Sequence, residues 1–295
     1  MKSIQNKIDF AVIFSVNHAN PNGDPLFGNR PRTIQQGFGE VSDVCIKRKI
    51  RDRWQDAGTA IYVQVDDKRV DDYRSLRERA EGELKGAAKD KAGYRQAACE
   101  KWLDVRAFGQ VFAFSGSKKK KGAGDAGDDE NSVAIGIRGP VSIHPAFSVV
   151  PVNVTSIQIT KSVSGEGDGS KRGSDTMGMK HRINHGVYVF YGSINPQLAT
   201  QTGFSEEDAE ALKTSLINLF ENDASSARPE GSMAVEKVFW WKHNCNNGQY
   251  SSAKVHRSLQ VKVLNPDAEP KAFPEDYTVS LEKLPGLEPE IYEGR

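Results

Sequence analysis

The 295-residue chain has little cysteine, no long apolar run and almost no net charge. Its three cysteines, Cys45, Cys99 and Cys245, are scattered and odd in number. This argues against a disulfide framework or a paired-cysteine zinc site and favours a reducing, cytoplasmic location. No stretch approaches the roughly 20 apolar residues of a membrane-spanning helix, and the N-terminus lacks the apolar core of a signal peptide. The formal net charge of +1 excludes a polycation, so any nucleic-acid binding must come from local basic clusters.

A strand, a long loop and a helix are expected at the start of the chain. The strand is predicted by strictly alternating apolar residues that would bury one face; they are Ile8, Phe10, Val12, Phe14 and Val16. The loop contains NPNGDPLFGNRPR over residues 20–32, where Pro, Gly and Asn favour turns and two arginines are present. Over residues 41–54 apolar residues recur at helical spacing, and Ser42 or Asp43 can cap this helix.

The region after this helix is expected to leave the main sheet. A short strand is predicted over 59–65, followed by charged, Ala-rich helices over 66–106 that form an insertion. The segment 115–131, SGSKKKKGAGDAGDDEN, carries basic and acidic runs that nearly cancel, which is typical of a mobile loop. We expect the insertion to face solvent, DNA or another subunit; an ordinary solvated helix is the alternative.

The second half of the chain rebuilds the sheet. One or two strands are expected within 138–163, and the strand 187–195 follows after a Gly-rich interruption over 164–186. A helix over 205–220 begins with the capping-box pair Ser205 and Asp208.

Two late strands complete the pattern, at 235–243 and 255–264, and the tail 281–295 is expected to be irregular. Strand, helix, strand, repeated once, predicts an α+β, ferredoxin-like plan with insertions at two places.

Basic residues cluster where the first loop meets the first helix. Lys47 and Arg51 lie one helical turn apart, with Arg48 beside them, on the side opposite the apolar stripe. A solvated helix face is the ordinary interpretation of such a pattern. Because the loop with Arg30 and Arg32 ends where this helix begins, the two groups can converge on one edge of the sheet. Turn-rich backbone N–H groups and arginine forks both bind phosphate, so convergence favours a phosphate-binding groove.

Other chemical signals are weak. His181 and His185 have i, i+4 spacing, but they lack the glutamate of a zinc protease and sit in a Gly-rich segment. His243, Cys245 and His256 are scattered without the pair-and-pair spacing of a zinc site. The segment GEGDGS lacks the Lys–Ser/Thr of a phosphate-binding loop. The sequence therefore gives no catalytic residue, metal site or cofactor.

Four ordered motifs carry a specific resemblance: NPNGDPLFGNRPR, VSDVCIKRKIR, IRGPV and DTMGMKHRINHGVYVFYG. Together they resemble the repeated backbone subunit of the type I-C CRISPR Cascade complex, the seven-type subunit of the repeat-associated protein superfamily. The resemblance covers nearly the whole chain. It implies one domain over 1–295, with a modified RNA-recognition-motif palm, a helical finger insertion over 61–134 and a thumb hairpin over 163–186.

The resemblance also implies a function in antiviral defence. Copies of such a subunit polymerise along a guide RNA and present it to target DNA. The implied partners are the guide RNA, target DNA, further copies of the chain, the five-type, large and small Cascade subunits and a recruited helicase-nuclease. The sites carried over for RNA binding are Asn20, Asn22, Gly28, Asn29, Arg30 and Arg32 in the loop, Lys47, Arg48 and Arg51 in the helix, and Met177, Gly178, Lys180, His181 and Arg182 in the thumb. The aromatic signatures of ordinary RNA-recognition motifs are missing, so contacts to the RNA backbone are expected instead of base reading.

Three alternatives stay open at this stage. Related backbone subunits of type III complexes cut target RNA with an acidic loop residue, and Asp24 is the candidate here, although an Asp before Pro ordinarily caps a turn. A metabolic ferredoxin-like enzyme is a blander possibility. Met177 and Met179 lie in a polar, Gly-rich segment and are expected beside an unstacked base; burial in the core is the alternative.

Overall fold

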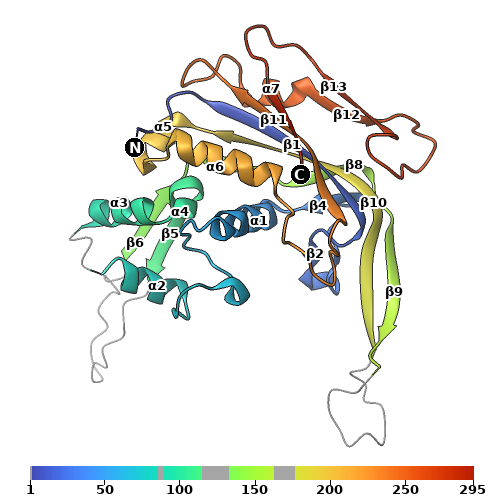
Figure 1. The fold of residues 1–295 in the computed structure, drawn as a ribbon, viewed down its shortest axis with the longest axis horizontal. Coiled ribbons are helices and arrows are strands. Elements are labelled where there is room, and N and C mark those ends of the chain that lie inside the picture. The colour runs from blue at the N-terminus through green and yellow to red at the C-terminus, as the bar shows by residue number, and fades with distance from the viewer. Residues whose placement is uncertain (1, 86–89, 115–132, 163–176) are drawn as a thin grey trace, which may run out of the picture.

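A computed structural model describes residues 2–85, 90–114, 133–162 and 177–295, which form a large antiparallel sheet with attached helices (Figure 1). The strands are β1 (Ile8–Ala19), β2 (Gly23–Asp24), β3 (Arg30–Pro31), β4 (Phe38–Val41), β5 (Gly109–Phe114), β6 (Val133–Arg138), β7 (Val141–Ile143), β8 (Ala146–Pro151), β9 (Val154–Thr160), β10 (Met177–Ile194), β11 (Met233–Lys242), β12 (Leu259–Val263), β13 (Tyr277–Leu281) and β14 (Glu290–Glu293). The helices are α1 (Asp43–Asp56), α2 (Leu76–Glu83), α3 (Lys91–Lys101), α4 (Leu103–Phe108), α5 (Pro196–Thr202), α6 (Glu206–Ile217) and α7 (Ser252–Ser258), with 3-10 turns η1 (Pro25–Phe27) and η2 (Asp66–Lys68).

The main sheet has the order β14, β11, β1, β10, β8 and β4, and β7 and β9 also pair with β10. These pairs are antiparallel. The predicted first strand is confirmed as β1, but residues Ile8–Val16 are buried without a break instead of on one face. The reason is that Ala11 and Ile13, between the alternating residues, are also apolar and pack on the second face of the sheet.

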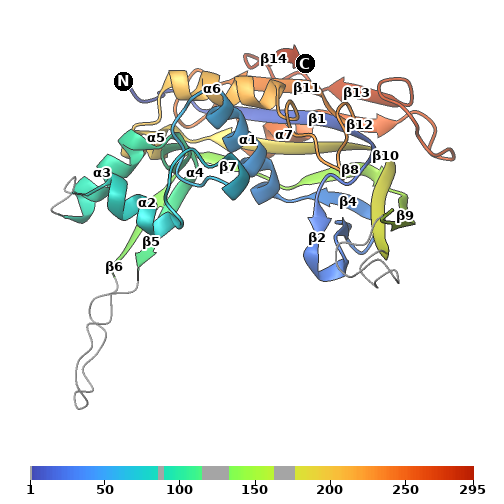
Figure 2. The ribbon, with the colours of Figure 1, turned by 60° about the horizontal axis from the view of Figure 1, so that its bottom comes forward.

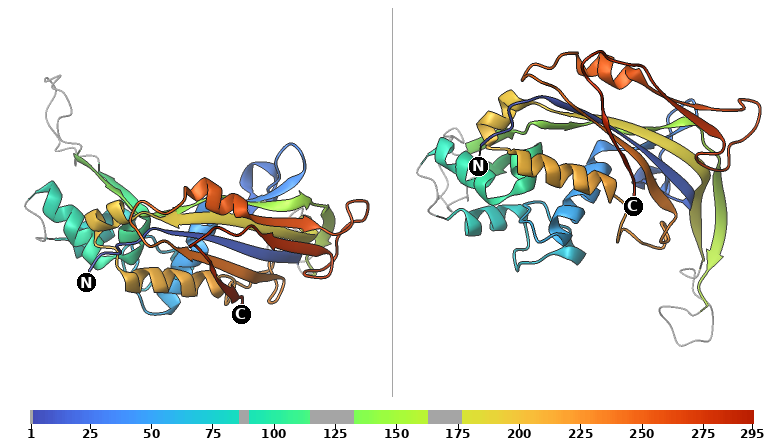
Figure 3. Two further views of the ribbon diagram at one scale, coloured as in Figure 1. Left: turned by 90° about the horizontal axis from the view of Figure 1, so that it is seen from above. Right: turned by 45° about the horizontal axis from the view of Figure 1, so that its top comes forward.

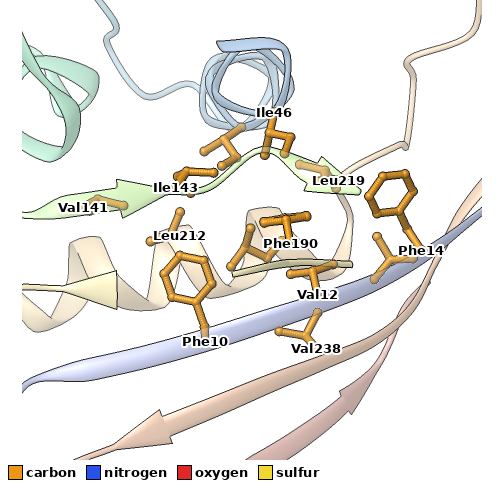
Figure 4. Packing of buried hydrophobic residues seen from close by; sticks show 14 of the residues in the cluster. Phe10, Val12, Phe14, Ile46, Val141, Ile143, Phe190, Leu212, Leu219 and Val238 are labelled. Carbon is orange, nitrogen blue, oxygen red and sulfur yellow. The ribbon is translucent and has the colours of Figure 1, made fainter. Parts of the chain in front are cut away.

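Helices α1 and α6 cover one face of the sheet and form the largest core with it. Figure 4 shows Phe10 and Phe14 of β1 pointing toward this layer. Ser42 accepts a hydrogen bond from the Cys45 N–H and caps α1, and the expected capping box of Ser205 begins α6. Caps of this kind satisfy backbone donors that the first helical turn leaves free.

The second face of the sheet is covered by α7 and the β12–β13 hairpin (Figure 3). Val255, Leu259 and Tyr277 pack there with Phe239 and Trp241 of β11. Within the described ranges, no helix combines the length and apolar character that crossing a membrane requires.

The insertion and the long hairpin lie at opposite ends of the sheet (Figures 1 and 2). Helices α2, α3 and α4 and the β5–β6 hairpin have a core of their own, separate from the sheet. Its buried members are Tyr62, Ala80, Leu84, Ala98, Cys99, Trp102, Val105, Phe112 and Ile135. At the other end, β9 pairs with the first seven residues of β10, from Met177↔Thr160 to Ile183↔Val154.

Several predicted element boundaries are wrong. The strand expected over 59–65 is a bend, because the N–H groups of Tyr62 and Val63 donate to the Asp104 carboxylate and not to a neighbouring strand. Residues 255–258 of the expected late strand belong to α7, which Ser251 caps.

The tail and the Gly-rich interruption also differ from expectation. The tail contains β14, which pairs with β11 at the edge of the sheet. Residues 177–186, expected to interrupt the sheet, are the first half of the continuous strand β10. The remainder of that interruption, 164–176, and the expected mobile loop at 115–131 lie outside the described residues.

Candidate nucleic-acid interface

The 20–32 loop is a tightly hydrogen-bonded turn. The Asp24 side chain accepts from the Leu26 N–H at 3.1 Å and caps η1, while its backbone carbonyl accepts from the Asn29 N–H at 2.8 Å. Gly28 and Asn29 both have left-handed backbone angles, with φ of 63° and 59°, which glycine and asparagine tolerate best. Buried Asn20 donates from Nδ2 to the Asn29 carbonyl at 2.7 Å. The loop therefore has a fixed shape.

Arg30 connects this loop to the β9–β10 hairpin through side-chain contacts. Its guanidinium donates to Ser156 Oγ of β9 at 2.7 Å and lies 3.5 Å from His181 Nδ1 of β10. Ser156 Oγ is also 2.8 Å from His181 Nδ1. Because arginine has only donors, the serine oxygen accepts from Arg30 and can donate its own hydrogen to the histidine. Neither partner is a carboxylate, and no ion pair among the described residues involves Arg30. Its positive charge remains available to an anion.

Strand alternation divides the hairpin residues between two faces. Residues directly opposite in an antiparallel pair share a face, so His181 and Ser156 lie with Met179 and Met177, beside Arg30. Lys180 and Arg182 point to the opposite face. The sequence analysis grouped Lys180, His181 and Arg182 as RNA-binding residues of one thumb; the register separates His181 from the other two.

The two methionines are exposed. Met177 is 66% exposed and Met179 57% exposed, and Gln158 Nε2 lies 3.4 Å from the Met177 sulfur. Burial in the core, the alternative for these residues, is therefore wrong for the chain alone. Gly178 faces away from them, opposite Ile159.

The loop is attached to the N-terminus of α1 through Asn22. Asn22 Oδ1 accepts from both the backbone N–H and the hydroxyl of Ser42, at 3.0 and 2.9 Å. Its backbone carbonyl accepts from the Arg32 N–H at 3.0 Å. Asn22 thus holds the turn against the helix, and its side-chain oxygen is occupied by these bonds.

The α1 cations form contacts within the protein. Lys47 pairs with Asp43 at 2.9 Å in the first two turns of the helix. Arg48 pairs with Asp52 at 2.9 Å and donates to the Val63 carbonyl at 2.6 Å. These contacts turn the basic face of α1 toward its own carboxylates and the insertion.

Arg51 makes the most buried of these contacts. Its Nε donates to Asp104 at 2.9 Å, and that carboxylate is only 1% exposed. An ion pair buried this well is costly to open, whereas the partly exposed Lys47–Asp43 pair contributes only a few tenths of a kcal/mol, about 0.3–0.5 for such helix pairs. Of the three cations, Lys47 can exchange its partner for a phosphate most easily.

Asp24 and Arg32 lie close together within the loop. Arg32 NH2 is 3.8 Å from Asp24 Oδ1, and both side chains are partly buried. The Asp24 carboxylate already caps η1, as the turn interpretation predicted. Within the described part of the chain, no three His, Cys, Asp or Glu side chains are grouped for a metal ion.

The scattered histidines belong to a buried polar network behind the sheet. His243 Nε2 donates to Asp9 Oδ2 at 2.9 Å, and its Nδ1 accepts from the Gln249 N–H at 2.9 Å. Burial raises the pKa of Asp9, but hydrogen bonds from His243 and Ser252 outweigh this and hold the pKa below its usual value. Burial lowers the pKa of His256, which lies 3.6 Å from Asp9. Both nitrogens of His243 are thus used in hydrogen bonds, not offered to a metal.

Two features of the interface were missed from the sequence. Ser156 lies in an apolar strand pattern and gains its role only from the register that brings it opposite His181. Leu26 and Phe27 are an adjacent apolar pair inside the turn-rich motif, and this pair was visible in the sequence. Their side chains are 89% and 69% exposed.

Comparison with known proteins gives the family. The family model described as CRISPR-associated protein Cas7 matches residues 6–282. The chain belongs to the Cas7 family. A curated relative, CRISPR-associated protein Cas7 of Haloferax volcanii, is 30% identical over 261 residues, covering 87% of this chain and 75% of the relative. The family predicted from the four motifs is confirmed, and the type I-C subtype stays a prediction.

Solved structures give only a distant likeness to this Cas7-family chain. One is a chain of a "CRISPR RNA-guided surveillance complex, pre-nicking", with 16% identity, a TM-score of 0.44 and coverage of 80% of this chain and 78% of that chain. Another is a chain of a "CRISPR RNA-guided surveillance complex", with 16% identity, a TM-score of 0.40 and coverage of 80% and 68%. At these scores the likeness adds nothing to the family assignment.

Proposed function

We propose that this Cas7-family chain is a non-catalytic backbone subunit of a CRISPR surveillance complex, binding guide RNA and presenting it to target DNA. The observation that carries the proposal is Arg30, a cation that contacts Ser156 and His181, not a carboxylate, at the junction of loop and hairpin. Phosphate oxygens are its natural partners, and phosphate contacts hold any guide sequence equally. The target-RNA nuclease is not favoured, because the Asp24 carboxylate caps a turn.

The proposal includes the domain plan of the resemblance. In the central strands the order β11–β1–β10–β8, with α1 and α6 on one face, supports a ferredoxin-like palm. The separate core of the insertion supports a finger over 61–134. The β9–β10 hairpin supports a thumb over 163–186 whose paired strands begin earlier, at Val154.

The proposed partners follow from this role. They are further copies of the chain along one guide RNA, the five-type, large and small subunits of a type I-C Cascade, and a recruited helicase-nuclease. Assembly takes place in the cytoplasm, where the guide RNA is made. Purification from a host that expresses a repeat–spacer array, followed by sequencing of the bound RNA, tests this part of the proposal.

The salt dependence of RNA binding tests the site. Full-length protein with Arg30→Gln should bind single-stranded RNA with a log–log salt slope reduced by about 0.7, the value for one lost phosphate contact. The reduction should be the same for two unrelated spacer sequences. Lys262→Gln is the control and should keep the wild-type slope. Lys262 lies on β12, which covers the face of the main sheet opposite α1 and α6. A slope unchanged by Arg30→Gln, or an effect confined to one sequence, would count against backbone tracking.

A further inference from the structure

The tip of the 20–32 loop exposes two adjacent apolar side chains. Leu26 is 89% exposed and Phe27 69% exposed. Single exposed apolar residues are ordinary on a protein surface, so the two side chains become informative through the structure of the loop that presents them. The other large exposed aromatic side chain in the described part of the chain, Phe147 of β8, is 41% exposed and lines a cavity of about 360 Å³ with Tyr191 and Val261.

The exposure of the tip is enforced by the loop's structure. The Asp24 cap, the left-handed Gly28 and Asn29, and the short β2–β3 pairing fix the backbone on both sides of the two residues. A flexible loop would fold an apolar pair back onto the protein surface. Here the turn presents it outward, so a ligand that stacks on the ring meets a side chain that is already positioned.

The tip lies in the same turn as Arg30, the cation of the proposed RNA site. Arg30 is three residues after Phe27 and contacts the hairpin through Ser156 and His181. In Figures 1 and 2 the loop with β2 lies between α1 and the β9–β10 hairpin. An exposed ring and a proposed phosphate-binding arginine within one fixed turn are the combination that single-stranded nucleic acid requires, since each nucleotide offers one phosphate and one flat base.

We propose that Phe27 stacks against a base of the bound single-stranded RNA, with Leu26 packed along the same nucleotide. This inference rests on the proposed function and adds a base contact to a site otherwise expected to hold phosphates. The contact is indifferent to sequence, because every base has a flat face. A second protein copy is the weaker occupant: a stable protein interface buries about 1,200–2,000 Å², and two side chains at a loop tip offer a small part of that.

Binding of unstructured RNA by the full-length protein tests the proposal. Phe27→Ala should weaken binding by about five- to 150-fold, the range for losing one stacked base, while the log–log salt slope stays at the wild-type value because no phosphate contact is lost. Phe27→Trp should retain wild-type affinity. Phe147→Ala is the matched control and should bind as wild type. RNA containing 5-iodouridine should crosslink on irradiation to the peptide that contains Phe27.

The possible failures are distinguishable. If wild-type protein binds no RNA, the proposed function falls and this inference with it. If wild-type protein binds RNA and Phe27→Ala binds it equally well, the stacking is refuted and the proposed function stands. A wild-type chain that self-associates in sedimentation, and that Phe27→Ala converts to monomer with unchanged RNA affinity, would assign the tip to a second copy and overturn the inference. Equal melting temperatures for all variants establish that none acts through unfolding.

Discussion

Replacing Asp104 by asparagine should destabilise the junction between α1 and the insertion. The Asp104 carboxylate is 1% exposed and has three donors: the backbone N–H groups of Tyr62 and Val63, at 2.6 and 3.0 Å, and Arg51 Nε at 2.9 Å. Asparagine keeps the shape and one acceptor oxygen but turns an N–H₂ group toward one of these donors. Arg51, itself mostly buried, then has no compensating charge.

The magnitude follows from the burial of the pair. Removing one partner of a buried ion pair costs about 3–5 kcal/mol, and we expect about 3 kcal/mol because asparagine retains one acceptor. Against a typical folding free energy of about 5–15 kcal/mol, this is a large fraction. With an unfolding entropy of about 2.1 cal/mol/K per residue, it corresponds to a fall in melting temperature of about 5 °C for a chain of 295 residues.

Urea unfolding with a matched control measures the effect. Asp43→Asn removes the carboxylate of the Lys47 pair on the same helix, where both side chains are partly exposed, and should cost less than about 1 kcal/mol. Hydrogen exchange should show lost protection at the amides of Tyr62 and Val63 in Asp104→Asn and no change there in Asp43→Asn. Equal costs for the two substitutions would refute the assignment of Asp104 as the buried centre of this junction.

The Arg51–Asp104 ion pair also bears on whether Arg51 has a structural role or binds a phosphate. If its role is structural, Arg51→Gln lowers the free energy of unfolding and leaves the salt slope of RNA binding at its wild-type value. A slope reduced by about 0.7, with stability unchanged, would restore the phosphate contact predicted from the sequence.

Two further outcomes are expected. Acidification should lower the melting temperature in two steps. Between about pH 7 and 5 unfolding takes up protons, because burial lowers the pKa of His256 and of His185 in the folded protein. Below about pH 4 unfolding takes up a further proton, because hydrogen bonds lower the pKa of Asp9 in the folded protein; His256→Gln should flatten the first step, and an unchanged profile would contradict this. Met177→Ala should change the chemical probing pattern of guide RNA in an assembled complex, while the free energy of unfolding stays within about 1 kcal/mol of the wild-type value because the side chain is 66% exposed. A lowered free energy of unfolding with unchanged probing would assign Met177 to packing instead.

The sequence predicted elements well where local chemistry decides them. The apolar alternation of β1, the Ser42 cap and the capping box of Ser205 all depend on neighbours within a few residues, and all three are present. The strand expected over 59–65 failed because its amides are satisfied by Asp104, some 40 residues away in sequence. A pattern of neighbouring residues cannot predict a hydrogen-bond partner that far away in the sequence.

The candidate site was predictable to the same extent. The turn-rich loop and its Arg30 stood out in the sequence, because Pro, Gly and Asn signal a turn wherever they occur. The α1 cations also stood out, but their carboxylate partners come partly from the insertion, which a helix pattern cannot locate. The division of Lys180 and His181 between two faces needed the continuous strand β10, which the Gly-rich composition concealed.

Helix α4 shows how the insertion is fixed relative to the proposed RNA site. Of its six residues, Leu103 and Ala107 pack in the main core, and Val105 packs in the core of the insertion. Its two charged residues lie between these and reach the two large helices: Asp104 binds Arg51 of α1, and Arg106 binds the Asp208 carboxylate at the start of α6 with two bonds of 2.8 Å. Apolar packing alone would let so short a helix slide, whereas two directional ion pairs set its rotation and register. Since α1 also holds the 20–32 loop through Ser42 and Asn22, the insertion and the Arg30 turn are attached to the same helix. A disturbance at Asp104 should therefore reach the proposed RNA site through α1, as a small loss of RNA affinity that accompanies the loss of stability.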